Sequence, residues 1–464
     1  MFRVSHDIQE HIPQAVRAIC DTLKDNGYQA YLVGGAVRDS LRGEAPEDWD
    51  VATDALPTTV LSLFPKTIPT GIKYGTVTVM LRGIAVEVTT FRSDGIYRDA
   101  RHPEDVSFST SIAEDLQRRD FTINAIAYDP EARKFIDPFG GRRDLGRRLL
   151  RTVGDPQERF AEDALRMLRF FRFMATLRFR PHRRTLAAID PPRIRNVSSE
   201  RIRDELSKLL LAKLPSKTLL TMHETGLLQE ILPEVAQGDG ITQGSFHRFD
   251  VLHHSLQALD SALPRLQLRW AALLHDAAKP MTRIEDADGI HFYGHDVEGE
   301  KLTRAILTRL RYSRELTEKV ALLVRWHMFP IHSRSTDKAL RRFIRKVGKE
   351  NVLDLMEIRR ADILALGRQA TWAGWTHWET LRERLVEVMD SDATFAVSDL
   401  AVSGHDVMAA LDLPPGPAVG AVLEWLLEKV LDDPQLNQRT RLLKLMQSYE
   451  KTPLVQKRQE NTYQ

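Results

Sequence analysis

Two aspartates near the amino terminus have the spacing of a metal-binding carboxylate pair. Asp48 and Asp50 lie two residues apart, so on an extended strand their side chains point to the same side. Two carboxylates held together repel each other unless cations lie between them, and Mg²⁺ prefers such oxygen ligands. Two ions there can activate an attacking hydroxyl group and stabilise departing pyrophosphate. Glu87, on a later predicted strand, is a candidate third catalytic carboxylate.

A glycine turn precedes this pair. Gly34 and Gly35 follow the apolar segment 28–33 and open a predicted helix that carries Arg38. Backbone N–H groups at such a turn, the helix dipole and the Arg38 guanidinium can together bind a triphosphate. The turn alone is weak evidence, but beside the aspartate pair it favours a nucleotide site over a solvated loop.

The elements that must position these residues alternate between helix and strand. A helical pattern covers 10–26, and the segments 28–33, 76–80 and 85–91 are predicted strands because they are apolar or rich in β-branched residues. From about Gly146 onward helical periodicity dominates. We therefore expect an α+β protein, with a small mixed sheet in an α/β head followed by almost entirely helical modules.

Bulk composition narrows the class of protein. At 464 residues the chain should form several modules, and it contains no apolar run long enough to be a signal peptide or to span a membrane. The single cysteine, Cys20, excludes an internal disulfide and a thiolate metal cluster, which agrees with a cytoplasmic location. Between Arg142 and Arg203 there are 17 arginines and 7 acidic residues, which favours a surface that faces nucleic acid.

The order of motifs in the first 205 residues resembles that of the class II nucleotidyltransferases, which include CCA-adding enzymes and bacterial poly(A) polymerases. The matching segments are 34–39 (GGAVRD), 48–50 (DWD), 118–125 (RRDFTINA), 137–141 (DPFGG) and 162–169 (EDALRMLR). The resemblance implies an enzyme that adds CCA to the 3′ end of tRNA from CTP and ATP, with Mg²⁺ as cofactor. Poly(A) addition, addition of the terminal A alone, and an RNA-binding or HD regulatory protein without catalysis remain alternatives.

Within this resemblance, a nucleotide-binding set can be named. We expect it to comprise Gly34, Gly35, Arg38, Arg119, Asp120, Asn124, Asp163, Arg166, Arg169 and Arg172. Two of these residues have simpler structural alternatives to nucleotide binding. Arg119 could form a local salt bridge, and Asn124 could cap a turn.

The segment from Arg159 to Phe173 reads as one helix, in which Asp163 and Arg166 are neighbours on one face. A carboxylate accepts hydrogen bonds and a guanidinium donates them, so the pair can bind the amino group and ring acceptor of cytosine or adenine. Uracil and guanine place a carbonyl against the carboxylate, which is costly. An ordinary surface ion pair is the alternative, and the resemblance implies the base-reading role.

Two further segments bear on which nucleotides are added. The polar stretch 94–108 contains Gly95 and Pro103 and reads as a mobile loop. The resemblance implies that such a loop accompanies addition of the terminal A. The segment 69–76 is similar to CCA-adding enzymes, since poly(A) polymerases carry a more basic element there.

A second set of metal-ligating residues lies in the helical part. Buried imidazoles and carboxylates are costly without partners, so a divalent metal is a natural reason for them to converge. The candidate ligands are His254, His275, Asp276, His295, His327 and Asp362. This set resembles the HD phosphohydrolases, which implies hydrolysis of phosphomonoesters or 2′,3′-cyclic phosphates and a second divalent metal. A fold remnant without metal is the alternative.

Four modules follow from these patterns. We expect a nucleotidyltransferase head at 1–145, a helical neck that binds the base and RNA at 146–235, an HD domain at 236–370 and a helical tail at 371–464. Helix packing is the simplest role of the tail, and the resemblance implies that it contacts tRNA.

Overall fold

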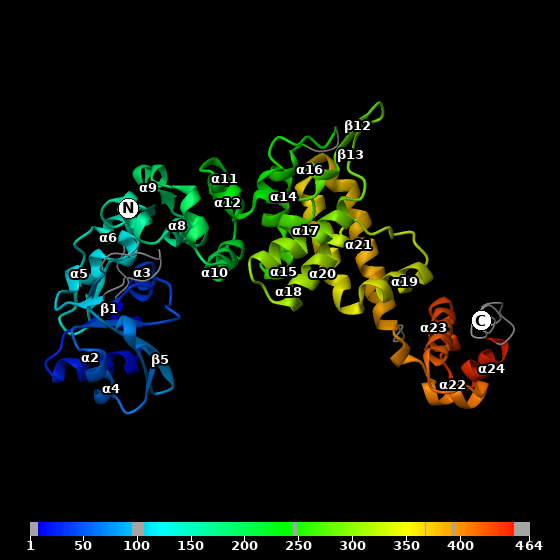
Figure 1. Cartoon of the computed structure of the whole chain (residues 1–464), viewed down its shortest axis with the longest axis horizontal. Coiled ribbons are helices and arrows are strands. Elements are labelled where there is room, and N and C mark those ends of the chain that lie inside the picture. The colour runs from blue at the N-terminus through cyan, green and yellow to red at the C-terminus, as the bar shows by residue number, and fades with distance from the viewer. Residues whose placement is uncertain (1–7, 95–105, 245–247, 367, 392–394, 450–464) are drawn as a thin grey trace, which may run out of the picture. The chain divides into compact units, whose positions relative to one another are not determined.

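The computed structural model describes residues 8–94, 106–244, 248–366, 368–391 and 395–449 (Figure 1). The chain divides into two compact units, one formed by residues up to Ala236 together with Arg309–Tyr312, and the other by the rest. The fold is α+β, as the sequence predicts, and its main sheet lies in the first unit. The four-module division stays a prediction, and its boundary at 370 falls within one long helix, α21 (Arg368–Ser391).

The main sheet has seven strands in the order β3-β4-β5-β2-β1-β8-β9. Strands β2 and β5 pair in parallel, whereas the other neighbours are antiparallel, so the sheet is mixed. The three strands expected from the sequence are β1, β4 and β5. The strands are β1 (Ala30–Val33), β2 (Asp50–Thr53), β3 (Thr67–Gly71), β4 (Thr76–Leu81), β5 (Ile84–Thr90), β8 (Ala127–Asp129) and β9 (Lys134–Ile136).

Short helices cover the sheet because their apolar faces need a partner. Helices α2, α3 and α4 pack against its strands. Val33, Phe91, Leu116 and Ala125 belong to one buried apolar cluster beneath the site described below. The helices of the head are α1 (Ile8–His11), α2 (Gln14–Asp25), α3 (Gly35–Leu41), α4 (Pro57–Leu63), α5 (Ile112–Gln117) and α6 (Gly141–Gly146).

Both ends of the segment predicted as a loop, 94–108, belong to short paired strands. Strands β6 (Arg92–Asp94) and β7 (Val106–Phe108) are antiparallel, with Asp94 opposite Val106. Residues 95–105, the rest of the segment for which a loop was predicted, lie outside the described residues. The segment 69–76 forms the end of β3, the short helix η1 (Ile72–Tyr74) and the start of β4.

One helix predicted from the sequence is two helices in the structure. Helix α7 ends at Glu162 and α8 begins at Leu165, because Asp163 is extended, with φ −144° and ψ 105°. The Asp163 carboxylate accepts a hydrogen bond from the Leu165 N–H at 3.0 Å, and this local contact competes with a continuous helix. The prediction of one helix across 159–173 was therefore wrong. Helix α10 packs along α8.

The remainder of the chain is helical apart from short strand pairs. These pairs are β10 (Leu149–Leu150) with β11 (Arg180–Pro181), and β12 (Ile284–Asp286) with β13 (Gly289–His291). None of the helices in the described ranges is long and apolar enough to cross a membrane. The other helices of the first unit are α7 (Pro156–Glu162), α8 (Leu165–Leu177), α9 (Arg183–Ala187), α10 (Ser199–Leu210), α11 (Ser216–Glu224), α12 (Leu227–Ile231) and α13 (Pro233–Ala236). The next helices along the chain are α14 (Val251–Ser261), α15 (Leu266–Leu274), α16 (Lys279–Thr282), α17 (His295–Arg309), α18 (Arg314–Arg325), α19 (Asp337–Val347), α20 (Lys349–Ala365), α21, α22 (Gly404–Leu411), α23 (Pro417–Asp432) and α24 (Arg439–Tyr449).

Candidate functional site

Three carboxylates gather where strand β2 begins, beside the middle of β5. Asp50 begins β2 and its partner in the parallel register is Glu87, so the two side chains project from the same face of the sheet. Asp48 is exposed and lies in a bend just before β2, which corrects the expectation that both aspartates share a strand. Burial, with the charges of Glu87 and Asp48, raises the pKa of Asp50 to about 6 despite the nearby Arg119. A divalent cation would relieve this repulsion, so the residues fit a metal.

Gly34 leaves room beside these carboxylates. Its φ is +73°, which favours glycine, and α3 begins at the next residue, as expected. A Cβ atom at position 34 would lie 3.1 Å from Asp50 Oδ2 and 3.2 Å from Arg119 Nη1. A side chain here would therefore fill the space between the carboxylate and the guanidinium.

The carboxylates open onto a cavity of about 500 Å³. Asp50, Glu87 and every predicted nucleotide-binding residue line it, whereas Asp48 is not among the lining residues. Seven arginines and four carboxylates give the wall a net positive charge, which suits a triphosphate. The lining residues are Val33, Gly34, Gly35, Arg38, Asp50, Glu87, Thr89, Arg118, Arg119, Asp120, Asn124, Asp163, Leu165, Arg166, Arg169, Arg172, Phe173 and Arg201.

Asp120 connects two sides of this wall. Its Oδ2 accepts from Arg169 Nη2 at 2.6 Å and Nε at 2.9 Å, and its Oδ1 accepts from Asn124 Nδ2 at 3.0 Å. Asn124 in turn accepts from Arg38 Nη1 at 2.8 Å. Burial opposes ionisation of Asp120, but Arg169 and the Asn124 hydrogen bond outweigh it and lower the pKa to about 2. Because both oxygens are used, Asp120 positions Asn124 and Arg169.

This lowered pKa makes the contribution of Asp120 to stability depend on pH. The folded pKa lies below the ordinary 3.8, so the stabilisation is present above about pH 4 and is lost as pH falls through 2. Asp120→Asn is expected to lower the free energy of unfolding by about 2 kcal/mol at pH 7 and by less at pH 3. Urea unfolding at both pH values measures this, with exposed Asp204→Asn as the control. An equal loss at the two pH values would contradict the lowered pKa.

The other arginines are held by buried acids and one aromatic ring. Arg119 Nη2 lies 3.1 Å from Asp115 Oδ2, whose side chain is 1% exposed. Arg169 and Arg172 both pair with the buried Glu205 of α10. The guanidinium of Arg172 stacks on the Phe173 ring, 3.8 Å from its centroid. These contacts fix the positive charges before any ligand binds.

Asp163 and Arg166 both line the cavity, but they do not form the ion pair considered from the sequence. Arg166 donates to Glu162 and to the carbonyl oxygens of Arg159 at 3.2 Å and Arg118 at 3.0 Å. Asp163 Oδ2 instead lies 2.7 Å from Arg201 Nη2. Leu168 and Phe171 are fully buried, as expected for the apolar face of α8.

Four functional side chains at this cavity were not predicted from the sequence. Three of them, Arg118, Phe173 and Arg201, line the cavity, and Glu205 supports it. The spacing of Arg201 and Glu205, one turn apart on a predicted helix, was the available signal. It indicates a shared face, but it does not reveal partners more than 30 residues away.

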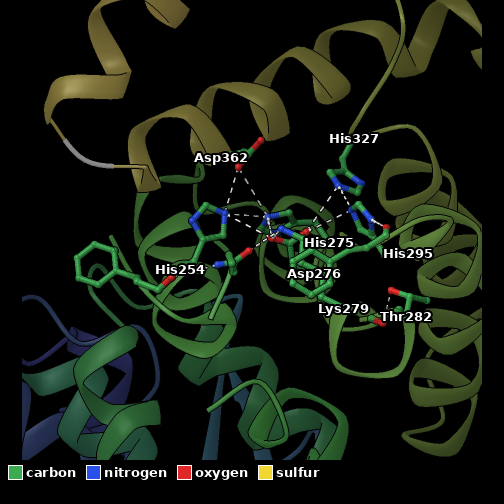
Figure 2. A network of polar contacts seen from close by, with 12 residues as sticks. His254, His275, Asp276, Lys279, Thr282, His295, His327 and Asp362 are labelled. Carbon is green, nitrogen blue, oxygen red and sulfur yellow. Dashed lines mark hydrogen bonds and ion pairs between the residues drawn. The ribbon is translucent and has the colours of Figure 1, made fainter. Parts of the chain in front are cut away.

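The six histidines and aspartates predicted as a second metal site converge in the second unit (Figure 2). Asp276 lies between two groups of ligands, each of which could hold a metal ion. Its Oδ2 is 3.1 Å from His275 Nε2, and its Oδ1 is 3.5 Å from His295 Nε2. The first group is His254, His275 and Asp276, and the second is Asp276, His295 and His327. Asp362 joins the first side through a 3.1 Å contact with His254 Nε2.

The backbone sets the orientation of three of these imidazoles. The Nδ1 atoms of His275, His295 and His327 face carbonyl oxygens of Ala272, Phe292 and Val324 at 2.8, 2.7 and 2.6 Å. A nitrogen that faces a carbonyl must carry a proton, so in all three rings Nδ1 is the donor to the backbone and Nε2 is directed to the centre. Burial, together with His275, lowers the pKa of His327 to about 3, which keeps this imidazole neutral.

A buried lysine completes this second centre. Lys279 Nζ donates to Asp276 Oδ2 at 2.7 Å and to Gln243 Oε1 at 2.6 Å. His275 and Lys279 lower the pKa of Asp276 well below its usual range, although burial opposes ionisation. The ionised carboxylate and the nitrogen-rich surroundings suit transition-metal ions such as Zn²⁺, Mn²⁺ or Fe²⁺.

Comparisons with known proteins agree with this geometry. Family models match at residues 30–151 (poly A polymerase head domain), 178–238 (RNA- and SrmB-binding site of polymerase A) and 295–446 (tRNA nucleotidyltransferase domain 2). The CCA-adding enzyme of Geobacillus sp. strain WCH70 is 35% identical over 92% of this chain and 95% of its own length. The A-adding tRNA nucleotidyltransferase of Deinococcus radiodurans is 36% identical over 86% of this chain and 91% of its own.

A solved structure extends the likeness to the fold. The Bacillus stearothermophilus CCA-adding enzyme in complex with CTP has a TM-score of 0.72 and 31% identity, over 97% of this chain and 98% of that one. Both the sequence and the architecture therefore match along almost the whole length. The chain belongs to the CCA-adding enzyme family of tRNA nucleotidyltransferases.

Proposed function

We propose that this enzyme adds CCA to the 3′ end of tRNA from CTP and ATP and releases pyrophosphate. The observation that carries the proposal is one cavity that joins acidic and arginine-rich walls, with Asp50 and Glu87 at one side and Asp163 and Arg166 at another. The tRNA substrate also fits the excess of arginines between Arg142 and Arg203. A cytoplasmic location follows from this substrate and agrees with the single cysteine.

Each part of the wall has its own task in this reaction. Asp48, Asp50 and Glu87 would hold divalent ions, proposed to be Mg²⁺, which supply activation of the tRNA 3′-hydroxyl and stabilisation of departing pyrophosphate. Gly34 keeps the space beside Asp50 open. Arg38 and Arg119 neutralise the triphosphate. Asp120 and Asn124 keep Arg38 and Arg169 in place through the hydrogen bonds described above.

Base selection falls to Asp163 and Arg166. Each oxygen of Asp163 carries one protein hydrogen bond, and each retains a lone pair for the amino group of cytosine or adenine. The three contacts of Arg166 use three of its five N–H donors. Donors thus remain for the ring acceptor of the base. A uracil carbonyl in place of the amino group would face the Asp163 carboxylate without a hydrogen atom between them.

Loss of the Asp163 carboxylate should therefore relax selection. Asp163→Ala is expected to reduce the preference for CTP over UTP about a hundredfold, since a mismatch of several kcal/mol is removed. The preference is measured as the ratio of kcat/KM for single-nucleotide addition with each triphosphate. Asp190→Ala, at an exposed ion pair of the same unit, is the matched control. Unchanged discrimination against UTP would remove Asp163 from base reading.

One assay tests the reaction itself. The protein is incubated with tRNA that ends at the discriminator base, or with tRNA that lacks only the final A, and with CTP, ATP or both. Growth by three nucleotides and then arrest supports the proposal. Long tails from ATP alone would indicate a poly(A) polymerase, and extension of the second tRNA alone would indicate an A-adding enzyme. No extension of either tRNA would leave an RNA-binding or regulatory protein.

We further propose that the histidine centre of the second unit holds two divalent ions and hydrolyses phosphomonoesters or 2′,3′-cyclic phosphates. Support comes from the two ligand groups that share Asp276. Such ions polarise a phosphoryl group and supply an ionised water at neutral pH. The protein's own part is to direct the Nε2 atoms of the imidazoles to the centre through carbonyl contacts and to keep Lys279 beside the shared carboxylate.

A further inference from the structure

We infer that Arg201 of helix α10 is a positioning residue for base selection, because it fixes the carboxylate with which Asp163 reads the base. The inference rests on the proposed function of this cavity. It assigns a specificity role to an arginine outside the motifs that identify the family in the sequence.

The Asp163 side chain is held by two hydrogen bonds. This residue lies between α7 and α8 in an extended conformation, so no helix holds its side chain. Two hydrogen bonds do so instead, from Leu165 N to Oδ1 at 3.0 Å and from Arg201 Nη2 to Oδ2 at 2.7 Å. One bond on each oxygen fixes the plane of the carboxylate and leaves a lone pair on each oxygen.

A fixed hydrogen-bond acceptor discriminates between bases better than a mobile one. A carboxylate free to rotate could turn away from a wrong carbonyl and bind water, which would reduce the penalty for UTP. A carboxylate held by Arg201 cannot avoid the mismatch without breaking a charged hydrogen bond. The side chains of Arg201 and Asp163 are 22% and 14% exposed, so solvent screens their contact only partly.

The role of Arg201 differs from that of the next turn of α10. Glu205 lies four residues after Arg201 and pairs with Arg169 and Arg172. The helix thus presents a cation to the base-reading acid and an anion to two cavity arginines. Because these partners differ, a change at Arg201 should alter selectivity, whereas a general disturbance of α10 should lower the rates with all nucleotides.

The experiment compares Arg201→Met and Arg201→Lys with the unmodified protein. The measured quantity is the ratio of kcat/KM for CTP to that for UTP, in single-nucleotide addition to tRNA that lacks CCA. We expect Arg201→Met to lower this ratio about tenfold. The kcat/KM for CTP should fall, and the kcat/KM for UTP should rise by a larger factor. Arg201→Lys keeps the positive charge and should recover part of the ratio. Arg203→Met is the matched control, since Arg203 is on the same helix but pairs with Asp204.

Each outcome has one meaning. A ratio unchanged in both Arg201 variants overturns the inference, and so does an equal fall in kcat/KM for CTP and UTP. If Arg201→Met fails to fold, the CTP/UTP ratio of Arg201→Lys decides the matter. A fall in that ratio of less than twofold in this folded variant counts against a positioning role for Arg201. An unmodified protein that incorporates UTP as well as CTP would instead overturn the proposed function, whatever the variants do.

Discussion

Asp48→Asn is expected to reduce nucleotide addition about a thousandfold while tRNA binding is retained, since several kcal/mol of charge stabilisation by bound ions is lost. Asp48 is exposed, so the substitution leaves the packing of the head intact. Its neighbour Asp50 is half-buried on β2, and removal of its carboxylate could also disturb the sheet. Asp48 therefore gives the cleaner test of the carboxylate site.

The measurement is the rate of ATP addition to tRNA that lacks the terminal A, under single-turnover conditions. A gel-shift titration reports tRNA binding, and a thermal melt reports folding. Glu47→Gln is the matched control, because Glu47 is also exposed and is adjacent to Asp48. If Asp48→Asn turns over within tenfold of the unmodified enzyme, the carboxylate pair does not hold the catalytic ions.

Asp276→Asn should remove both ions from the second centre and lower phosphoester hydrolysis at least about a hundredfold, since one ligand is shared by both groups. Asparagine retains a carbonyl oxygen for Lys279, so the buried ammonium keeps a hydrogen-bond acceptor. The unit should thus fold. Nucleotide addition should be unchanged because none of the residues around that cavity is altered.

Metal content by elemental analysis and hydrolysis of 2′,3′-cyclic AMP are the two measurements. Asp406→Asn is the matched control: it lies in another His-Asp dipeptide, but it is a half-buried residue of the capping box in the first turn of α22 and pairs with Arg439. Retention of the full metal content by Asp276→Asn would refute the shared-ligand centre. If Asp276→Asn loses the metal but the unmodified protein does not hydrolyse 2′,3′-cyclic AMP, the centre is a structural metal site.

Much of the head could be predicted because its signals are local. Runs of β-branched residues predicted strands β4 and β5, and the glycine turn predicted the start of helix α3. The convergence of the six histidines and aspartates in the second unit was also predictable, because buried imidazole and carboxylate need partners. The strands and the helix start follow from local sequence patterns. The convergence of the six polar side chains follows from the free-energy cost of burying them without partners.

The cavity wall was less predictable, because its contacts join distant segments. The partner of Asp120 is Arg169, and Arg166 binds the carbonyl oxygen of Arg118. Periodicity alone also continued a helix through Asp163, since apolar residues recur on both sides of it. The competing hydrogen bond from Leu165 is a geometric detail that residue types do not specify.

The shared carboxylate of Asp276 has a consequence for how the second centre would fill. Its two oxygens face different ligand groups, so an ion on one side changes the charge that the other side presents. Thermodynamic reciprocity requires that each ion alter the affinity of the other by the same factor. A titration with a single divalent ion should consequently deviate from two independent isotherms, with the sign of cooperativity set by that one side chain.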